Sequence, residues 1–165
     1  MFAHLKTNIH DWNNEDEIRR YLRRILQREA YDGTGLIYGI GHAVYTKSDP
    51  RSVILKQMAQ ELAEEKGRTV EYQFLERLER IAIETVYEVK GKGKCLCANV
   101  DFYSGFVYDL IGLPVEIYTP LFAMSRIVGW CAHRSEELCF SGSRIIRPAY
   151  RCVADTMQYT PLHQR

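Results

Sequence analysis

Hydrophobic residues recur at helical spacing through most of the first 140 positions. Ile18, Leu22 and Ile25 fall on one face of a helix, with acidic residues before them and arginines after them. Both sets of charges complement a helix dipole. The pattern therefore predicts a helix that ends at the turn residues 32–35.

Two more helices are predicted downstream. Asp49-Pro50 is typical of an N-cap followed by proline at the first helical position. The residues after it supply an apolar face that continues until Gly67, and they are Val53, Ile54, Met58 and Leu62. A similar pattern from Leu75 to Val89 predicts a third helix, which stops at the glycine-containing segment 91–93.

The last third of the chain is predicted to hold a short helix over 106–111 and a long helix from Pro120 to about Leu138. Alternating strand patterns are scarce, and residues 143–153 are the only extended candidate. The pattern as a whole indicates an all-α fold.

Composition narrows the classes of function. The 22 lysines and arginines nearly balance the 21 aspartates and glutamates, so we expect no general attraction to nucleic acid or anionic membranes. No apolar run approaches the roughly 20 residues that span a bilayer. Five cysteines without a secretory leader favour reduced thiols in a cytoplasmic protein, and their spacing does not fit a zinc site. We expect no metal.

A glycine-rich segment carries the first candidate chemistry. Residues 35–51 read GLIYGIGHAVYTKSDPR. Gly39 and Gly41 allow the backbone to approach a ligand closely, and His42 follows them directly. Arg51, in the first turn of the predicted helix, completes the outline of an anion pocket. A purely structural turn with a solvated arginine is the alternative.

Charged residues in apolar surroundings are further candidates. Asp101 lies between Val100 and Phe102, where partial desolvation would favour a general base, although it could instead cap the next helix. Arg126 and Arg147 also need an anionic partner, which could be a ligand or a structural carboxylate.

Four segments in this order resemble the C-terminal part of citrate synthases. They are GLIYGIGHAVYTKSDPR, ANVDFYSG, LFAMSRIVGW and RIIRPAY, and the resemblance extends from about Asn8 to Tyr150. It implies an almost entirely helical fold. Residues 1–105 would form the small domain, with the end of a preceding helix at 1–7. Residues 106–165, including the long C-terminal helix, would return to the large domain and the interface of a homodimer.

The resemblance also implies a Claisen condensation of acetyl-CoA with oxaloacetate, which yields citrate and CoA after hydrolysis. His42 would polarise the ketone of oxaloacetate, and Asp101 would remove a proton from the acetyl methyl group. Arg51, Arg126 and Arg147 would bind carboxylates, and Arg147 would reach the neighbouring subunit's site. No cofactor is implied beyond acetyl-CoA, which is a substrate.

Contacts with CoA are implied for the glycine-rich segment and for Asn99. The segment residues are Leu36, Ile37, Tyr38, Gly39, Ile40 and Gly41, acting through backbone groups. Some family members carry an arginine for the CoA phosphates where this chain has Thr46. Lys47 could take its place. The lysines at 92 and 94 could also meet the phosphates, and a solvated basic turn is the alternative.

The family's enol-stabilising histidine, in a motif like HGGAN, is absent from these 165 residues. We therefore expect the chain alone to be inactive. Apolar residues also spread around much of the predicted C-terminal helix and would need other neighbours, so we expect a dimer or larger. Three alternatives remain: a 2-methylcitrate synthase that uses propionyl-CoA, a relative of the citryl-CoA-handling end of ATP citrate lyase, and a CoA-binding module without catalysis.

Overall fold

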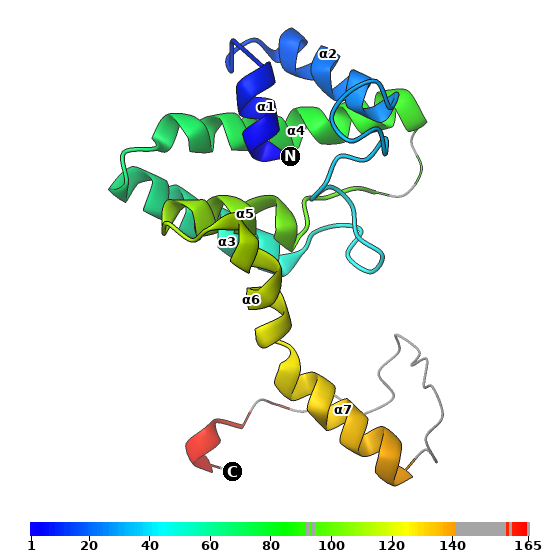
Figure 1. Cartoon of the computed structure of the whole chain (residues 1–165), viewed down its shortest axis with the longest axis vertical. Helices are drawn as coiled ribbons and strands as arrows, with labels where there is room; N and C mark the ends of the chain where they lie inside the picture. Colours follow the sequence, from blue (N-terminus) through cyan, green and yellow to red (C-terminus); the bar gives the residue numbers. More distant parts are fainter. Residues whose placement is uncertain (92, 94, 141–157, 159, 165) are drawn as a thin grey trace. The chain divides into compact units, whose positions relative to one another are not determined.

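The chain forms helices joined by loops, as the sequence pattern predicts. A computed structural model describes residues 1–91, 93, 95–140, 158 and 160–164. The helices are α1 (Phe2–Asn8), α2 (Glu15–Leu26), α3 (Pro50–Glu65), α4 (Thr69–Lys90), α5 (Val100–Leu110), η1 (Val115–Ile117), α6 (Tyr118–Met124), α7 (Ile127–Phe140) and η2 (Leu162–Gln164) (Figure 1). These described residues contain no strand beyond an isolated antiparallel bridge between Ile40 and Ala98.

Two compact units make up the chain, Met1–Pro120 and Leu121–Arg165. In the first unit α2 packs along α4, and α3 packs against both α4 and α5. The predicted domain boundary after residue 105 falls inside α5. The division into a small domain, residues 1–105, and a part that returns to a large domain, residues 106–165, stays a prediction.

Side-chain caps define where three of the helices begin. Asn14, Asp49 and Asn99 each accept a hydrogen bond from a backbone N–H in the first turn of the following helix. Asp49-Pro50 therefore starts α3 as predicted. The start predicted for the next short helix, Phe106, is wrong, because the Asn99 cap places the first turn at Val100.

The end of α2 also differs from the prediction. The helix stops at Leu26 rather than near residue 32. Arg28 and Tyr31 then adopt left-handed backbone conformations, with φ of 66° and 63°. Two such residues cannot continue a right-handed helix, so the acidic-to-basic pattern overestimated its length by more than a turn.

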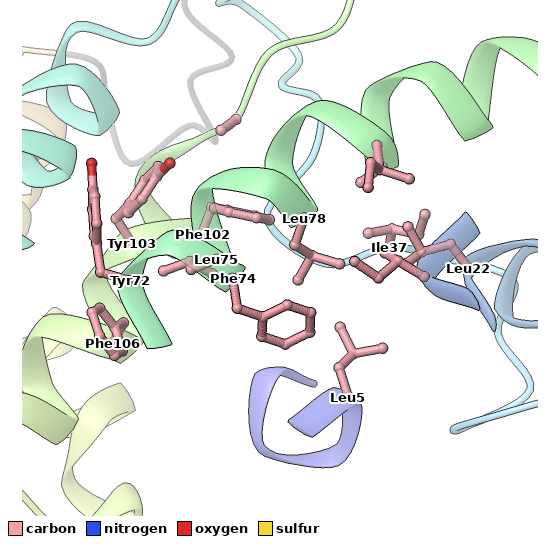
Figure 2. Packing of buried hydrophobic residues seen from close by; sticks show 14 of the residues in the cluster. Leu5, Leu22, Ile37, Tyr72, Phe74, Leu75, Leu78, Phe102, Tyr103 and Phe106 are labelled. Carbon is pink, nitrogen blue, oxygen red and sulfur yellow. The ribbon is translucent and has the colours of Figure 1, made fainter. Parts of the chain in front are cut away.

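The core of the first unit is built around α4. Its buried side chains include Phe74, Leu75 and Leu78, which face residues of α1, α2 and α5 such as Leu5, Leu22 and Phe106 (Figure 2). Ile37, from the glycine-rich segment, joins the same cluster. The loop that carries the candidate site is therefore anchored to the core.

The apolar face predicted for α3 packs only in part, through Leu62, which is partly buried against the core. Val53, Ile54 and Met58 are exposed. The buried positions are instead the small residues Ser52, Ala59 and Ala63. Small side chains let α3 approach α4 and α5 closely, and this requirement outweighs hydrophobicity at those positions.

The predicted long C-terminal helix is divided into α6 and α7. Ser125 and Arg126 form a turn between them, in which the N–H of Arg126 bonds to the carbonyl of Ala123 at 3.0 Å. The extended candidate at 143–153 lies outside the described residues. Among the helices that are described, none combines the length and the apolar character that crossing a bilayer requires.

Candidate active site

Two segments far apart in the sequence pair at the candidate site. The N–H of Gly41 donates to the carbonyl of Cys97 at 2.8 Å, and the N–H of Asn99 donates to the carbonyl of Gly39 at 2.8 Å. The Ile40–Ala98 bridge lies between these two bonds. This ladder joins the segment that carries His42, one residue after Gly41, to the segment that carries Asp101, two residues after Asn99. Because the pairing is antiparallel, the two residues follow opposite ends of the ladder.

Gly39 is required by both its conformation and its surroundings. Its φ is +87°, in the left-handed region. A Cβ added there would lie 2.8 Å from the Cα of Phe102, well inside van der Waals contact. Only glycine allows the loop to approach the start of α5 this closely.

Asn99 links the loop to α5 through both ends of its side-chain amide. Its Nδ2 donates to the carbonyl of Gly41 at 2.8 Å, and its Oδ1 accepts from the N–H of Asp101 at 2.9 Å. The resemblance placed Asn99 near CoA. The structure gives it a bracing role, and contact with CoA stays a prediction.

The imidazole of His42 has a defined orientation. Its Nδ1 accepts hydrogen bonds from the backbone N–H groups of Val44, at 3.0 Å, and Tyr45, at 3.1 Å. A ring nitrogen that accepts carries no proton, so the neutral ring keeps its proton on Nε2. The side chain is exposed, and Nε2–H is therefore available as a hydrogen-bond donor to a ligand.

Arg51 is held by a carboxylate that the sequence reading treated only as a cap. Asp49 is 1% exposed; its two oxygens accept from Nε of Arg51 at 3.0 Å and from Nη2 at 2.8 Å. The hydrogen bond from Arg51 holds the pKa of Asp49 below its usual value. That same bond, joined by the charges of Asp49 and Asp101, raises the pKa of Arg51. In the part of the chain that is described, Nη1 of Arg51 makes no hydrogen bond.

Asp101 lies in the first turn of α5 with its side chain exposed. The alternative that it caps this helix is wrong, because Asn99 is the cap. The expectation of partial burial is also wrong for this chain, since the apolar neighbour Phe102 points into the core while Asp101 does not. A base for a carbon acid would need additional protein to exclude water.

The residues predicted to bind CoA differ in the exposure of their side chains. Leu36 and Tyr38 are exposed, and the hydroxyl of Tyr38 donates to Asp32 at 2.7 Å. Ile37 is buried, so only its backbone remains for a ligand, whereas Ile40, Gly39 and Gly41 lie on the ladder. CoA binding by these residues stays a prediction. Residues 92 and 94 lie outside the described residues.

The remaining arginine candidates are Arg126 and Arg147. Arg126 belongs to the second unit, where Nη1 donates to the carbonyl of Phe122 at 2.9 Å and the guanidinium lies over that ring. Arg147 lies outside the described residues. Their roles as carboxylate ligands stay predictions.

The site is open rather than enclosed. A cavity of about 280 Å³ lies beside it, lined by residues that include Asp49, Ser52 and Cys97, but His42, Arg51 and Asp101 are not among them. Across the described residues, no cluster of histidine, cysteine and carboxylate side chains could hold a metal ion.

The family model and the similar proteins all point to the same protein family. The family model for the citrate synthase C-terminal domain matches residues 4–149. The chain belongs to the citrate synthase family. A citrate synthase from Synechocystis sp. is 35% identical over 151 residues, which are 91% of this chain and 35% of that protein. A 2-methylcitrate synthase from Shewanella oneidensis is also 35% identical, over 141 residues that cover 86% of this chain and 34% of that one.

Solved citrate synthases share the fold. The enzyme from Thermoplasma acidophilum was solved in a ternary complex with carboxymethyl coenzyme A and oxaloacetate. It matches 99% of this chain and 44% of its own, with 31% identity and a TM-score of 0.57. The enzyme from Thermotoga maritima matches with 28% identity and a TM-score of 0.61. The chain spans about a third of the length of the curated relatives it matches.

Two site residues were missed by sequence reasoning. Asp49 was read as a cap alone, although an aspartate two residues before an arginine is placed to bind its side chain. Tyr45 was not singled out, yet its ring lies 4.9 Å from that of His42. No spacing rule signals such a ring contact, which depends on how the loop turns after His42.

Proposed function

We propose that this chain is the part of a citrate synthase that activates oxaloacetate and supplies the catalytic base. The observation that carries the proposal is the orientation of His42: backbone N–H groups occupy Nδ1, and Nε2–H is left to donate beside Arg51. The neutral Nε2–H group of His42 can polarise a ketone by donating a hydrogen bond to its oxygen, before any proton is transferred.

Each of the three residues then has a distinct task. Asp101 takes a proton from the methyl group of acetyl-CoA, and the resulting carbon nucleophile attacks the ketone carbon of oxaloacetate. Nε2–H of His42 stabilises the ketone oxygen and then gives it the proton that makes the hydroxyl of citryl-CoA. The proton taken by Asp101 is released to water, from which His42 regains one. Arg51 offers Nη1 to a carboxylate, while Asp49 fixes its plane. Water then hydrolyses the thioester to citrate and CoA.

The exposure of the site supports a second part of the proposal, that the 165-residue chain alone does not turn over. A carboxylate removes a weakly acidic C–H proton efficiently only when it is closely positioned and water is excluded. Here Asp101 is exposed. We propose that a large domain and a second subunit close the site in the whole enzyme, which needs no cofactor besides its acyl-CoA substrate.

Exposed apolar residues of the second unit favour the homodimer. Met124, Ile127, Val128 and Trp130 are each more than half exposed. Apolar side chains gathered in one short segment are typical of an interaction surface. Sedimentation at micromolar concentration should show a dimer or larger species, and a strictly monomeric profile would contradict this part of the proposal.

The test is a chimera in which this chain replaces the matching C-terminal part of the Thermotoga maritima enzyme. We expect it to release CoA from acetyl-CoA only when oxaloacetate is present. His42→Gln and Asp101→Asn should each lower kcat by about 10²–10⁴-fold. A folded chimera that binds CoA without turnover would instead favour a non-catalytic CoA-binding module.

A second candidate is 2-methylcitrate synthesis, because the Shewanella oneidensis 2-methylcitrate synthase is as similar to this chain as the Synechocystis citrate synthase. The two reactions differ by one methylene in the acyl group, which a pocket discriminates by about 10–200-fold. The ratio of kcat/KM for acetyl-CoA and propionyl-CoA in the same chimera decides between them.

A further inference from the structure

Tyr45 contacts both polar groups of the candidate site through one aromatic ring. The ring centroid lies 4.9 Å from that of His42, with an angle of 37° between the planes. Cζ of Arg51 lies 5.2 Å from the centroid of the same ring. The ring is therefore shared by an imidazole and a guanidinium that come from different parts of the 35–51 segment.

The backbone of Tyr45 is fixed as well. Its N–H donates to Nδ1 of His42 at 3.1 Å, and its carbonyl accepts from the thiol of Cys97 at 3.4 Å. Cys97 is one end of the ladder that joins the loop to the start of α5. The backbone that carries the Tyr45 ring is therefore held in place by hydrogen bonds on both sides.

The hydrogen bonds to His42 and Arg51 do not fix the tilt of either side-chain plane, and the Tyr45 ring restricts that tilt. Two N–H groups fix the position of Nδ1 in His42, but the imidazole can still tilt about that point. Asp49 holds Arg51 by the edge of its guanidinium, at Nε and Nη2, and leaves the faces free. An aromatic ring restricts tilting because ring pairs and cations over rings prefer particular separations and faces.

We propose that Tyr45 is a positioning residue whose ring sets the imidazole of His42 and the guanidinium of Arg51 relative to each other. Nε2–H of His42 and Nη1 of Arg51 would then face a single small keto acid, with one donor for its ketone and one for its carboxylate. The identity of that ligand rests on the proposed function. The coupling of the two side chains through Tyr45 does not.

The experiment uses the 165-residue chain labelled with ¹⁵N and observes side-chain resonances of His42 and Arg51 by NMR. In the unmodified chain, nuclear Overhauser effects should join the Tyr45 ring protons to both side chains. The ¹⁵N shifts of His42 should report an accepting Nδ1 and a protonated Nε2. Absence of either set of Overhauser effects overturns the proposal without any variant.

Two substitutions then separate the ring from the hydroxyl. Tyr45→Leu should move the His42 ¹⁵N shifts toward the average of the two neutral tautomers and speed solvent exchange of Nε–H in Arg51. Tyr45→Phe keeps the ring face and should preserve both signatures. If Tyr45→Leu leaves either residue unchanged, or if Tyr45→Phe behaves like Tyr45→Leu, the ring does not couple them.

Tyr21→Leu is the matched control. Tyr21 pairs with another histidine, His4, whose Nε2 lies 2.7 Å from the Tyr21 hydroxyl. This substitution should move the resonances of His4 and leave those of His42 unchanged. None of these readouts depends on turnover, so a correct result for Tyr45 with an inactive chimera would reject the proposed function and keep the positioning role.

Discussion

The α2–α4 scaffold and the candidate site are stabilised in different ways. The scaffold buries Ile18, Leu22 and Leu78 completely and adds ion pairs at its surface, such as Arg19 with Glu84 at 2.7 Å. At the site His42 and Asp101 are exposed, and they are placed by glycine conformations and by a few hydrogen bonds between side chains and the backbone. Nonspecific burial can hold the scaffold, whereas the site depends on a few particular atoms.

The largest expected effect comes from the scaffold. Leu78→Ala should lower the free energy of unfolding by about 3 kcal/mol, because it removes a fully buried side chain and leaves a cavity. Urea unfolding followed by circular dichroism measures this change. Leu36→Ala, in the site loop, is the control: Leu36 is 51% exposed, and its loss should change stability by less than about 0.5 kcal/mol.

The next prediction concerns the conformation of the loop. Gly39→Ala should cost about 2 kcal/mol, because the new methyl group meets Phe102 and the residue has positive φ. Gly33→Ala also adds a methyl group at positive φ, of +70°, but nothing lies within 4 Å of it. A cost near 1 kcal/mol is expected there. Equal costs for the two substitutions would show that the close approach to α5 is unimportant.

Asn99 should matter more than an ordinary helix cap. Asn99→Ala removes the cap of α5 and the bond to the carbonyl of Gly41, so we expect a loss of about 1.5 kcal/mol and a shift of the His42 resonances. Asn14→Ala, which removes the cap of α2, should cost about 1 kcal/mol and leave His42 unchanged. If both variants leave His42 unchanged, the ladder does not position it.

The smallest effect is electrostatic and depends on pH. Hydrogen bonds from Arg68, together with Lys6, lower the pKa of Glu71 from 4.5 to about 2. A lowered carboxyl pKa stabilises the fold above pH 4.5 and loses that contribution as the pH falls toward 2. Glu71→Gln should therefore cost about 1 kcal/mol at pH 7 and almost nothing near pH 2.

Urea unfolding at several pH values measures that dependence. Glu65→Gln is the control, because Glu65 is exposed and its one ion pair within the described ranges is with its neighbour Lys66 at 3.3 Å. A Glu71→Gln deficit that stayed constant between pH 7 and pH 2.5 would mean that the carboxylate contributes through packing rather than charge.

The fold was more predictable than the details of the site. Helical periodicity predicted α2, α3 and α4, and Asp49-Pro50 gave the start of α3 correctly. Periodicity could not show that α3 packs through Ser52, Ala59 and Ala63, because small residues carry no hydrophobic signal. It also could not show the break at Ser125, since nothing in the local sequence forbids a continuous helix there.

For the site, the sequence predicts which residues carry the chemistry but not which neighbouring groups hold them in place. The sequence predicts His42, Arg51 and Asp101 as site residues, and the ladder joins the two segments that carry them. The bond between Asp49 and Arg51, the cap at Asn99 and the ring of Tyr45 required coordinates. Each depends on side-chain direction, which spacing along the chain does not determine.

The central claim is that His42, Arg51 and Asp101 contact one ligand on a single surface. The most direct measurement is an NMR titration of the ¹⁵N-labelled chain with oxaloacetate in the presence of carboxymethyl coenzyme A. We predict that the three residues shift together and yield one Kd, with accompanying changes across Leu36–Gly41. Shifts confined to one of the three, or three residues with different Kd values, would contradict the claim.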